Sequence, residues 1–450
     1  MPPVLHLKTE DVDTPEKRGG YTVALIGCSP KAIRYALEFA DAGFKVLCAD
    51  ADQSVIKRLS KGNLHLGDRQ AEAKFKHLIR KEQLNLTSDL KAAVSRCDIL
   101  IITVGVKIDE KKNGDASEIV GVCKQVGTTL QKGSLIVYCG VAGIGAVETV
   151  VKESIENTSG LMAGEDFGIA YWPTYNSTMY SEKQVSDEEL VISSNDKSSL
   201  NSATSIFQQI ARKDVKRSSN IKVAELAMLF AAVKRDVGEA LANEMAMFCE
   251  RAGLDYIEVA KLLETDIHGA NFIPTISDET NSDEAYVLLE NAENLNVKFR
   301  LPAIARQVNE EMVKHAVSLV QDALHDGGKT LRRARVALLG ATKAGTAAAT
   351  FVELLRTKGA KVTRYDPSFS ITDQSEEPSL KKTLNETVEG TDCLVIMSSQ
   401  DQLKRLNLKK LHALMKSPAA IVDLVGVAEP GKVAGNGFIY RGLGRGAWKK

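Results

Sequence analysis

The 450-residue chain is too long for one hydrophobic core, because such cores stop growing at about 250–300 residues. With 44% hydrophobic and 26% charged residues it has an ordinary globular composition, which excludes the disordered, collagen-like and disulfide-rich classes. Its 58 basic residues are balanced by 58 acidic ones, and the basic clusters at 329–335 and 404–410 are typical of solvated helix ends or loops. We therefore expect two or three domains and no nucleic-acid partner.

The seven cysteines predict a reducing compartment. They are scattered, odd in number and mostly inside apolar runs, without the spacing of a disulfide framework or a metal site. No apolar run approaches the roughly 18 residues that a membrane span needs, and the N-terminus is polar. We expect a cytoplasmic protein without a membrane partner.

Residues 1–20 begin with two early prolines, followed by charges and a Gly-Gly pair, which predicts a flexible tail. From residue 21 onward short apolar runs alternate with helical spacing, which predicts a doubly wound parallel sheet of the dinucleotide-binding type over 21–215. Strands are expected at 22–26, 45–49, 99–104 and 134–138, and helices at 30–42, 71–81 and 116–130.

The segment 216–330 is predicted to be helical. Apolar residues recur at helical spacing from 221 to 252, which indicates one long helix with Gly238 as its weak point. A helix of this length needs another structural element to pack against along its length. Further helices are expected at 256–263, 285–294 and 302–324, with a loop at 277–284.

The β pattern restarts near residue 335, which predicts a second, smaller Rossmann-like domain over 331–450. Its strands are expected at 336–339, 361–365, 393–397 and 420–424, its first helix at 344–358, and an extended tail at 437–450. The predicted fold class is thus α/β, with two Rossmann-like doubly wound parallel-sheet domains joined by a helical segment that contains a long central helix.

The segment after the first strand reads Gly27-Cys28-Ser29-Pro30-Lys31-Ala32. A dinucleotide fingerprint has glycine at the first, third and sixth positions, and here only the first is glycine. Ser29 and Pro30 are typical of a helix start, since serine caps backbone N–H groups and proline lacks one. Because a helix N-terminus attracts phosphate and Lys31 adds a cation, we expect residues 27–31 to contact a cofactor, with the Ser29 side chain weakening its affinity.

Asp50 follows the second strand, 23 residues after Gly27. An acidic side chain at this point accepts hydrogen bonds from an adenosine ribose and repels a 2′-phosphate, which favours NAD over NADP. The alternative is an aspartate that only caps the strand end in a domain that binds nothing. Residues 340–346 are predicted to form a strand-to-helix turn, which lacks the lysine that follows the last glycine of a P-loop but could still contact a phosphate.

Short motifs follow one another in a fixed order along residues 21–450. They are Gly62-Asn63 with His65, Ser159-Gly160-Leu161 with Gly164-Glu165-Asp166-Phe167, Ala224-Glu225-Leu226-Ala227 with Arg235-Asp236 and Ala242-Asn243-Glu244, Arg306-Gln307-Val308-Asn309 with Met312, Asp366-Pro367, and Tyr440-Arg441-Gly442-Leu443-Gly444-Arg445-Gly446. Together they resemble the nucleotide-sugar dehydrogenases, the UDP-glucose and UDP-N-acetylmannosamine 6-dehydrogenase family.

The resemblance implies oxidation of a sugar C6 alcohol to a carboxylate by two hydride transfers to NAD, through a cysteine thioester. A lysine, an asparagine and a glutamate or threonine would orient water and stabilise the oxyanion. The resemblance also implies a nucleotide-sugar ligand, a place in polysaccharide biosynthesis and a homodimer formed through the helix 221–252.

This chain departs from the family pattern where the chemistry should be. Phe272 stands at the position of the nucleophilic cysteine, Met228 at that of the lysine, Ala232 at that of the asparagine, and Thr174 where a glutamate is usual. No cysteine lies between Cys249 and Cys393 to replace the nucleophile. Elsewhere in this chain the family's Pro-Thr-Pro turn appears as Val104-Gly105-Val106, of which Val104 and Gly105 are expected to contact the cofactor. The family's Ser-Thr pair appears as Cys139-Gly140, and an arginine of its last domain appears as Val425.

Three functions remain open on the sequence. The first is a non-catalytic or regulatory homologue, a pseudoenzyme that still binds a dinucleotide. The second is an active oxidoreductase with non-covalent chemistry on a nucleotide sugar or another alcohol, which needs a general base, for which Lys234, Asp236, His268 and His315 are candidates. The third is a dimeric scaffold that binds a protein partner.

Overall fold

The computed structural model describes residues 3–62, 64, 69–109, 111–174, 189–263, 273–276, 282–340, 347–367 and 379–446. The chain forms two compact units. Unit 1 comprises Met1–Ala232 and Asp283–Lys298, and unit 2 comprises Val233–Ser282 and Phe299–Lys450. The long helix predicted from the sequence is confirmed as α9 (Ile221–Ala252), which starts in unit 1 and ends in unit 2.

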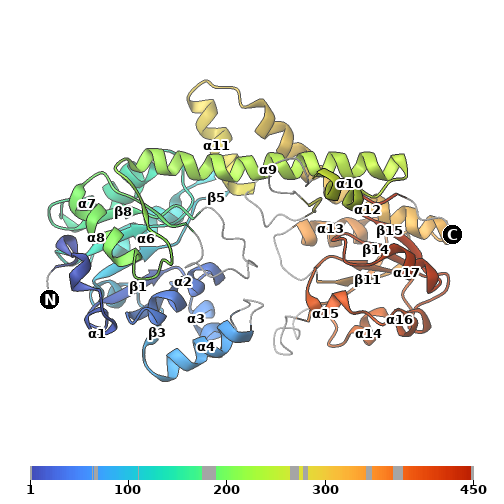
Figure 1. Ribbon diagram of the computed structural model, residues 1–450, viewed down its shortest axis with the longest axis horizontal. Coiled ribbons are helices and arrows are strands. Elements are labelled where there is room, and N and C mark those ends of the chain that lie inside the picture. Colours follow the sequence, from blue (N-terminus) through green and yellow to red (C-terminus); the bar gives the residue numbers. More distant parts are fainter. Residues whose placement is uncertain are drawn as a thin grey trace. The chain divides into compact units, whose positions relative to one another are not determined.

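Unit 1 is built on an eight-stranded sheet (Figure 1). Its neighbouring strands are parallel except for the pair β8 and β9. Across the sheet the order is β3 (Leu84–Thr87), β2 (Lys45–Ala49), β1 (Thr22–Ile26), β4 (Ile99–Ile102), β7 (Leu135–Tyr138), β8 (Gly168–Tyr171), β9 (Val191–Ser193) and β10 (Lys216–Ser218). Strand order reverses between β1 and β4, so the carboxyl ends of these two strands border the crevice in which doubly wound sheets bind their ligands.

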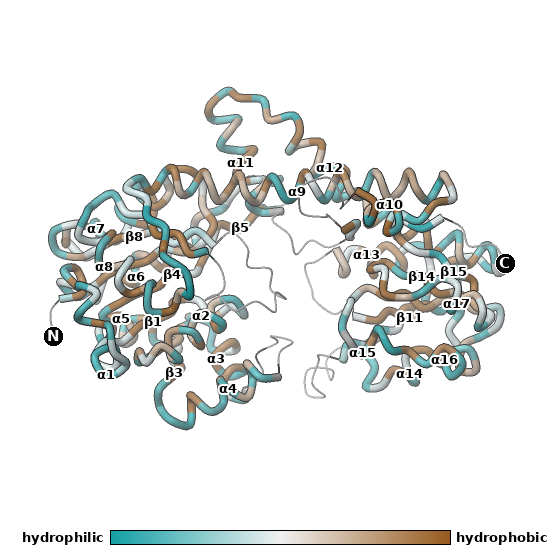
Figure 2. Tube along the Cα trace, in the orientation of Figure 1, coloured by the Kyte–Doolittle hydropathy of each residue, from teal (hydrophilic) through white to brown (hydrophobic). Residues whose placement is uncertain are grey.

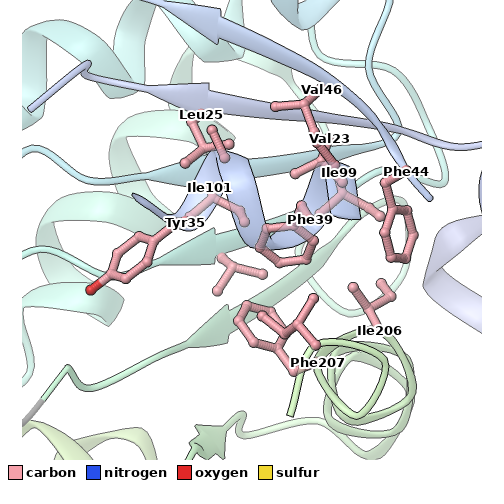
Figure 3. Close-up of a cluster of buried hydrophobic side chains, with 14 of the residues drawn as sticks. Val23, Leu25, Tyr35, Phe39, Phe44, Val46, Ile99, Ile101, Ile206 and Phe207 are labelled. Carbon is pink, nitrogen blue, oxygen red and sulfur yellow. The ribbon is translucent and has the colours of Figure 1, made fainter. Parts of the chain in front are cut away.

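Helices cover both faces of this sheet and enclose two separate cores. Figure 3 shows one of them, in which Phe39 of α2 (Pro30–Asp41) and Phe207 of α8 (Lys197–Phe207) pack against the apolar side chains of β1, β2 and β4. The second core contains α6 (Ser117–Gly127) and the first turns of α9. Unit 1 also contains α3 (Gln53–Ser60), α4 (Arg69–Arg80), α5 (Leu90–Val94), the π-helical segment η3 (Val147–Lys152), α7 (Glu153–Ser159) and α11 (Ser282–Asn294).

The prediction of a flexible tail at residues 1–20 is wrong for the described residues from Pro3 onward. They form three short helical elements, η1 (Val4–His6), η2 (Thr9–Asp11) and α1 (Pro15–Arg18). Leu5 and Leu7 are buried, and the hydroxyl of Ser202 on α8 donates to the carbonyl of Leu5 and accepts from the amide of Leu7. The segment is held because its few apolar side chains complete the core of unit 1.

Unit 2 contains a five-stranded, fully parallel sheet and its own apolar core. The strand order is β12 (Lys361–Tyr365), β11 (Arg335–Leu339), β13 (Cys393–Ile396), β14 (Ala420–Asp423) and β15 (Ile439–Gly442). Its helices are α10 (Tyr256–Leu263), α12 (Arg300–Asp326), α13 (Ala347–Thr357), α14 (Leu384–Val388), α15 (Asp401–Lys404), α16 (Leu408–Leu414) and α17 (Pro430–Gly435).

The predicted extended tail at 437–450 is corrected by β15, which pairs with β14 along Ala420 to Asp423. Residues 447–450 of that prediction, and most of the predicted loop at 277–284, lie outside the described residues. Figure 2 shows hydrophobic residues along the strands of both sheets, as expected for parallel strands that are buried on both faces. In the part of the chain that the structure describes, no helix is long and apolar enough to cross a membrane.

Candidate functional site

The turn after β1 requires glycine. Gly27 has a φ of 94°, and a Cβ atom there would lie 2.8 Å from the Thr103 hydroxyl oxygen. That hydroxyl is 3.0 Å from the carbonyl oxygens of both Ile26 and Gly27, to which it can donate. The first glycine of the fingerprint is therefore required for the tight turn after β1.

The helix start at Ser29 and Pro30 is confirmed. The Ser29 hydroxyl accepts from the Ala32 amide at 3.2 Å, and Pro30 is the first residue of α2. Ala32 is fully buried, so a small residue here does the packing for which the fingerprint uses its last glycine. The first turn of α2 follows the carboxyl end of β1, where its N-terminus provides a positive potential for a phosphate.

The Asp50 side chain connects the turn after β1 to the turn after β2. One carboxylate oxygen accepts from the Cys28 amide at 2.8 Å, and the other accepts from the Asp52 amide at 2.9 Å. The capping role that the sequence left as an alternative is thus present. Each carboxylate oxygen has two lone pairs, so the same half-buried side chain can also accept from a ribose hydroxyl.

Val104 and Gly105 lie against the loop that follows β7. The Val106 amide donates to the Val141 carbonyl at 2.8 Å, and a Cβ on Gly105 would lie 3.1 Å from the Val141 amide nitrogen. The fold therefore brings the candidate cofactor residues to the carboxyl edge of neighbouring strands: residues 27–31 follow β1, Asp50 follows β2, and Val104 and Gly105 follow β4.

The side chain of Lys31 spans this edge of the sheet. Its ammonium group donates to the hydroxyl of Thr174 at 2.6 Å, which connects the first turn of α2 to the segment after β8. The contact joins residues 143 positions apart, so the sequence analysis placed both residues in the site without predicting that they meet. In unit 1 a cation thus contacts Thr174, the residue that the sequence analysis aligned with a family glutamate.

Met228 and Ala232 are buried, with 3% and 4% of their surface exposed. The Tyr171 hydroxyl donates to the Met228 sulfur at 3.0 Å, and the Tyr171 ring stacks on Tyr138 with ring centroids 6.1 Å apart. Met228 belongs to the second core of unit 1. Met228, which the sequence analysis aligned with the family's lysine, is therefore an apolar side chain in a closely packed setting.

Two of the predicted general bases are paired inside unit 2. The Asp236 carboxylate lies 3.1 Å from the Arg306 guanidinium and accepts from the Asn309 amide group at 2.9 Å. His315 lies 2.9 Å from Glu250. Lys234 is exposed, whereas His268 and Phe272 lie outside the described residues.

Cys139 and Cys249, the thiols that could be asked to replace a missing nucleophile, are both buried and free. Burial raises the pKa of the Cys139 thiol to about 12 and also raises the pKa of the Cys249 thiol. Only the thiolate is a strong nucleophile, and at neutral pH both groups are held in the thiol form.

A buried carboxylate that the sequence analysis quoted without a role holds the loop after β7. Glu225 of α9 accepts from the Gly145 amide at 2.6 Å and from the Val147 amide at 2.9 Å, at the start of η3. Burial raises its pKa to about 7, although the two amide donors act in the opposite direction.

In unit 2 the segment after β14 is held by Asp423. Its carboxylate accepts from the amides of Val425, Gly426 and Ala428 at 3.1, 2.9 and 2.6 Å. Arg445 donates to the Ala428 carbonyl at 2.9 Å from the other side. Val425 therefore sits in an ordered turn at the carboxyl edge of the second sheet, while residues 341–346 lie outside the described residues.

Family models match three successive segments of the chain. They are the NAD binding domain of the UDP-glucose/GDP-mannose dehydrogenase family over residues 22–211, its central domain over 222–311, and its UDP binding domain over 344–430.

Curated relatives match over nearly their whole length. UDP-N-acetyl-D-mannosamine dehydrogenase of Pyrococcus horikoshii is 27% identical over 436 residues, which cover 94% of this chain and 99% of the relative. UDP-N-acetyl-D-glucosamine 6-dehydrogenase of Pseudomonas aeruginosa is 25% identical over 410 residues, 89% of this chain and 96% of the relative.

Solved structures of nucleotide-sugar dehydrogenases are similar to this chain over nearly its whole length. The UDP-D-ManNAc dehydrogenase structure from Pyrococcus horikoshii aligns with a TM-score of 0.80 at 25% identity, over 94% of this chain and 99% of that one. A UDP-glucose dehydrogenase from Pyrobaculum islandicum, with a TM-score of 0.77 at 19% identity over 94% and 98% of the two chains, shows the shared fold. The chain therefore belongs to the UDP-glucose/GDP-mannose dehydrogenase family of NAD-dependent nucleotide-sugar dehydrogenases, and its N-terminal domain is that family's NAD-binding domain.

Proposed function

We propose that this chain is a non-catalytic, regulatory member of its family, which binds NAD in unit 1 and a nucleotide sugar but does not perform the four-electron oxidation. The observation that carries the proposal is Met228, whose sulfur accepts the Tyr171 hydroxyl in the buried position of the family's lysine. A thioether has no charge with which to stabilise an oxyanion or hold a water for hydrolysis.

The residues expected to contact the cofactor support the proposal that the chain binds NAD. The turn at Gly27, the capped N-terminus of α2 and the Asp50 carboxylate are the three elements that hold the pyrophosphate and the adenosine ribose in doubly wound folds. Lys31 adds a cation beside the phosphates. When bound, NAD would supply a hydride acceptor, while the residues of this chain bind and orient it. The Asp50 charge favours NAD over NADP, because it would repel a 2′-phosphate.

The lack of a cysteine at position 272 supports the proposal that the chain does not perform the four-electron oxidation. Position 272 is a phenylalanine, which cannot form a thioester, and the buried Cys139 and Cys249 thiols have raised pKa values. Ala232, one turn beyond Met228 on α9, has no group to orient a substrate.

Calorimetric titration combined with a turnover assay tests the proposal. We expect NAD to bind to the purified full chain, and NADH formation to stay at the background level with UDP-glucose, UDP-N-acetylglucosamine and UDP-N-acetylmannosamine. The Pyrococcus horikoshii relative is the positive control for the assay with its own substrate.

The yield of NADH per sugar distinguishes the alternatives. Two NADH per sugar would overturn the proposal and show the family reaction. One NADH per sugar would also overturn it, in favour of an oxidoreductase with non-covalent, two-electron chemistry. A chain that binds neither NAD nor a UDP-sugar would have to act as a scaffold instead.

We also propose that the protein is a homodimer formed through α9. Leu241 and Phe248 are 56% and 72% exposed, and they lie seven residues apart and so on one face of the helix. Large apolar side chains grouped in this way mark interaction surfaces.

A cytoplasmic location is proposed as well, because all seven cysteines are free thiols, which is typical of a reducing compartment.

A further inference from the structure

Unit 1 contains a pocket of about 160 Å³ between α11 and the segments that follow β4 and β7. One wall is the hairpin of β5 (Lys107–Ile108) and β6 (Gly114–Asp115), which leads into α6, and the other is the loop after β7, which leads into η3. Val106, Ile119 and Val150 make the lining mostly apolar. The described residues that are expected to contact NAD do not line this pocket, so it is a separate feature of unit 1.

Hydrogen bonds fix α11 against both walls. The Glu290 carboxylate accepts from the Gly114 amide at 2.9 Å, and the Asn291 side-chain oxygen accepts from the Ile144 amide at 3.0 Å. The approach is close on both sides, because a Cβ on Gly114 would lie 3.1 Å from a Glu290 carboxylate oxygen and one on Gly143 would lie 2.9 Å from the Asn291 side-chain nitrogen. The walls are thus held at a set distance, and the alanine side chains of the lining are too small to fill the space between them.

Glu290 gives the pocket its chemical character. The Gly114 amide uses one of about four acceptor positions of the carboxylate. Among the described residues no lysine or arginine is paired with Glu290. The neighbouring Asn291 is already used on both sides, since its nitrogen also donates to the Val287 carbonyl at 2.7 Å. A carboxylate in an apolar wall is best satisfied by a cationic donor, because charge-assisted hydrogen bonds are the stronger kind.

The volume limits the apolar part of such a ligand, since an apolar cavity of about 150 Å³ holds a benzene ring. We propose that this pocket is a ligand site for a small organic ammonium ion, whose apolar group of about six carbon atoms contacts the lining and whose ammonium group donates to Glu290. Asn294 is exposed and also lines the pocket, so the site reaches the surface at the end of α11.

Benzylamine is the test ligand, because it is a cation at neutral pH and carries one ring, and benzyl alcohol is its neutral counterpart. In ligand-detected NMR titrations of the full chain at low salt, we expect benzylamine to bind with a Kd in the millimolar range or below, and benzyl alcohol to bind about fivefold more weakly or worse. No binding of benzylamine, or equal Kd values for the two ligands, would overturn the proposal. Neither result bears on NAD binding, which uses other residues.

Two variants of α11 test the charge. Glu290→Gln keeps an oxygen for the Gly114 amide but removes the charge, and we expect it to raise the Kd of benzylamine by about fivefold or more. The Kd of benzyl alcohol should stay within about twofold. Glu293→Gln is the matched control, because it removes a charge from the same helix outside the pocket, and it should leave both Kd values within about twofold. An unchanged Kd of benzylamine in Glu290→Gln would overturn the role of the carboxylate.

A third variant tests the location. Val150→Phe places extra ring atoms in the pocket, and we expect it to abolish binding of both ligands. Cooperative unfolding followed by the fluorescence of Trp172 reports that this variant is folded. Benzylamine that binds equally well to the folded Val150→Phe protein would lie elsewhere, and the proposed site would be wrong.

Discussion

Glu225 and Met228 lie about one turn apart on α9, and both are buried in unit 1. The carboxylate is compensated by two backbone amides of the loop after β7, whereas the thioether lies in an apolar core and accepts one tyrosine hydroxyl. Each side chain therefore contributes to how α9 attaches to the first sheet, and each can be tested through stability.

Glu225 should make unit 1 less stable as the pH rises from 4.5 to 7. Burial raises its pKa from 4.5 to about 7 in the folded protein, so in this window the unfolded chain releases the proton while the folded chain keeps it. The expected loss is about 3 kcal/mol, and stability should level off above pH 7. In Glu225→Gln this fall should be absent.

Urea unfolding followed by the fluorescence of Trp172, which is buried in unit 1, measures the effect. A Trp448→Phe background leaves Trp172 as the single tryptophan, because the sequence contains two. Comparing both proteins at pH 5 and pH 8 removes the contributions of other groups, and equal pH dependence in the two would contradict the prediction.

Replacing Met228 by the lysine that the family resemblance implies there should destabilise unit 1. Met228→Lys would bury an ammonium group in an apolar core, at a cost of about 3 kcal/mol or more. Met228→Leu conserves the volume and should cost less than about 1.5 kcal/mol. The same Trp172 unfolding measurement applies, and a lysine variant as stable as the leucine variant would show that this position is open to water.

At the scale of elements, α9 and α12 are joined within unit 2 by buried polar groups. Asn309 of α12 donates to Asp236 and accepts from Asn243, both on α9, and Arg306 pairs with Asp236. Asn243 also accepts from the amide of Thr275 at 2.9 Å, so the network holds the described segment 273–276 against α9. These positions belong to motifs that the sequence analysis used for the family resemblance, and the structure gives them a packing role.

Removing the cation from this network should be costly. Arg306→Met leaves the Asp236 carboxylate buried without its opposite charge, which typically costs about 3–5 kcal/mol. The double variant Arg306→Met with Asp236→Leu should recover most of this loss, because it removes both charges. Native-state hydrogen exchange of the α12 amides is the measurement, and equal protection in the single and double variants would show that the two charges are not coupled.

The long helices and the strands with continuous apolar runs were predicted well because their signals are local, whereas β3, β8, β9 and β10 were not predicted. Continuous apolar runs predicted β1, β4 and β11, and helical spacing predicted all of α9. The strand β15 was missed because Ile439–Gly442 lies in a glycine-rich segment with a weak β pattern, and only its pairing with β14 makes it a strand.

At the scale of the whole molecule, the chain forms two compact units, and α9 contributes to both. The dimer proposal predicts that Phe248→Asp gives a monomer in light scattering, because a charge would replace the most exposed apolar side chain of α9 in the proposed contact. Met162→Asp is the matched control, since Met162 is 53% exposed and lies on unit 1 away from α9 in the sequence. A monomeric unmodified protein, or a dimer that persists in Phe248→Asp, would contradict the proposed interface.

The sequence by itself determined most of the order of elements and the capped helix start of the cofactor domain, and it predicted which of the family's catalytic groups are replaced, because these depend on local patterns and residue identity. Tertiary structure alone decided that Lys31 meets Thr174, that Glu225 caps the loop after β7 and that residues 3–20 pack on α8. Those contacts join residues 143, 80 and 197 positions apart, and a local pattern contains no information about which distant partner the fold brings near.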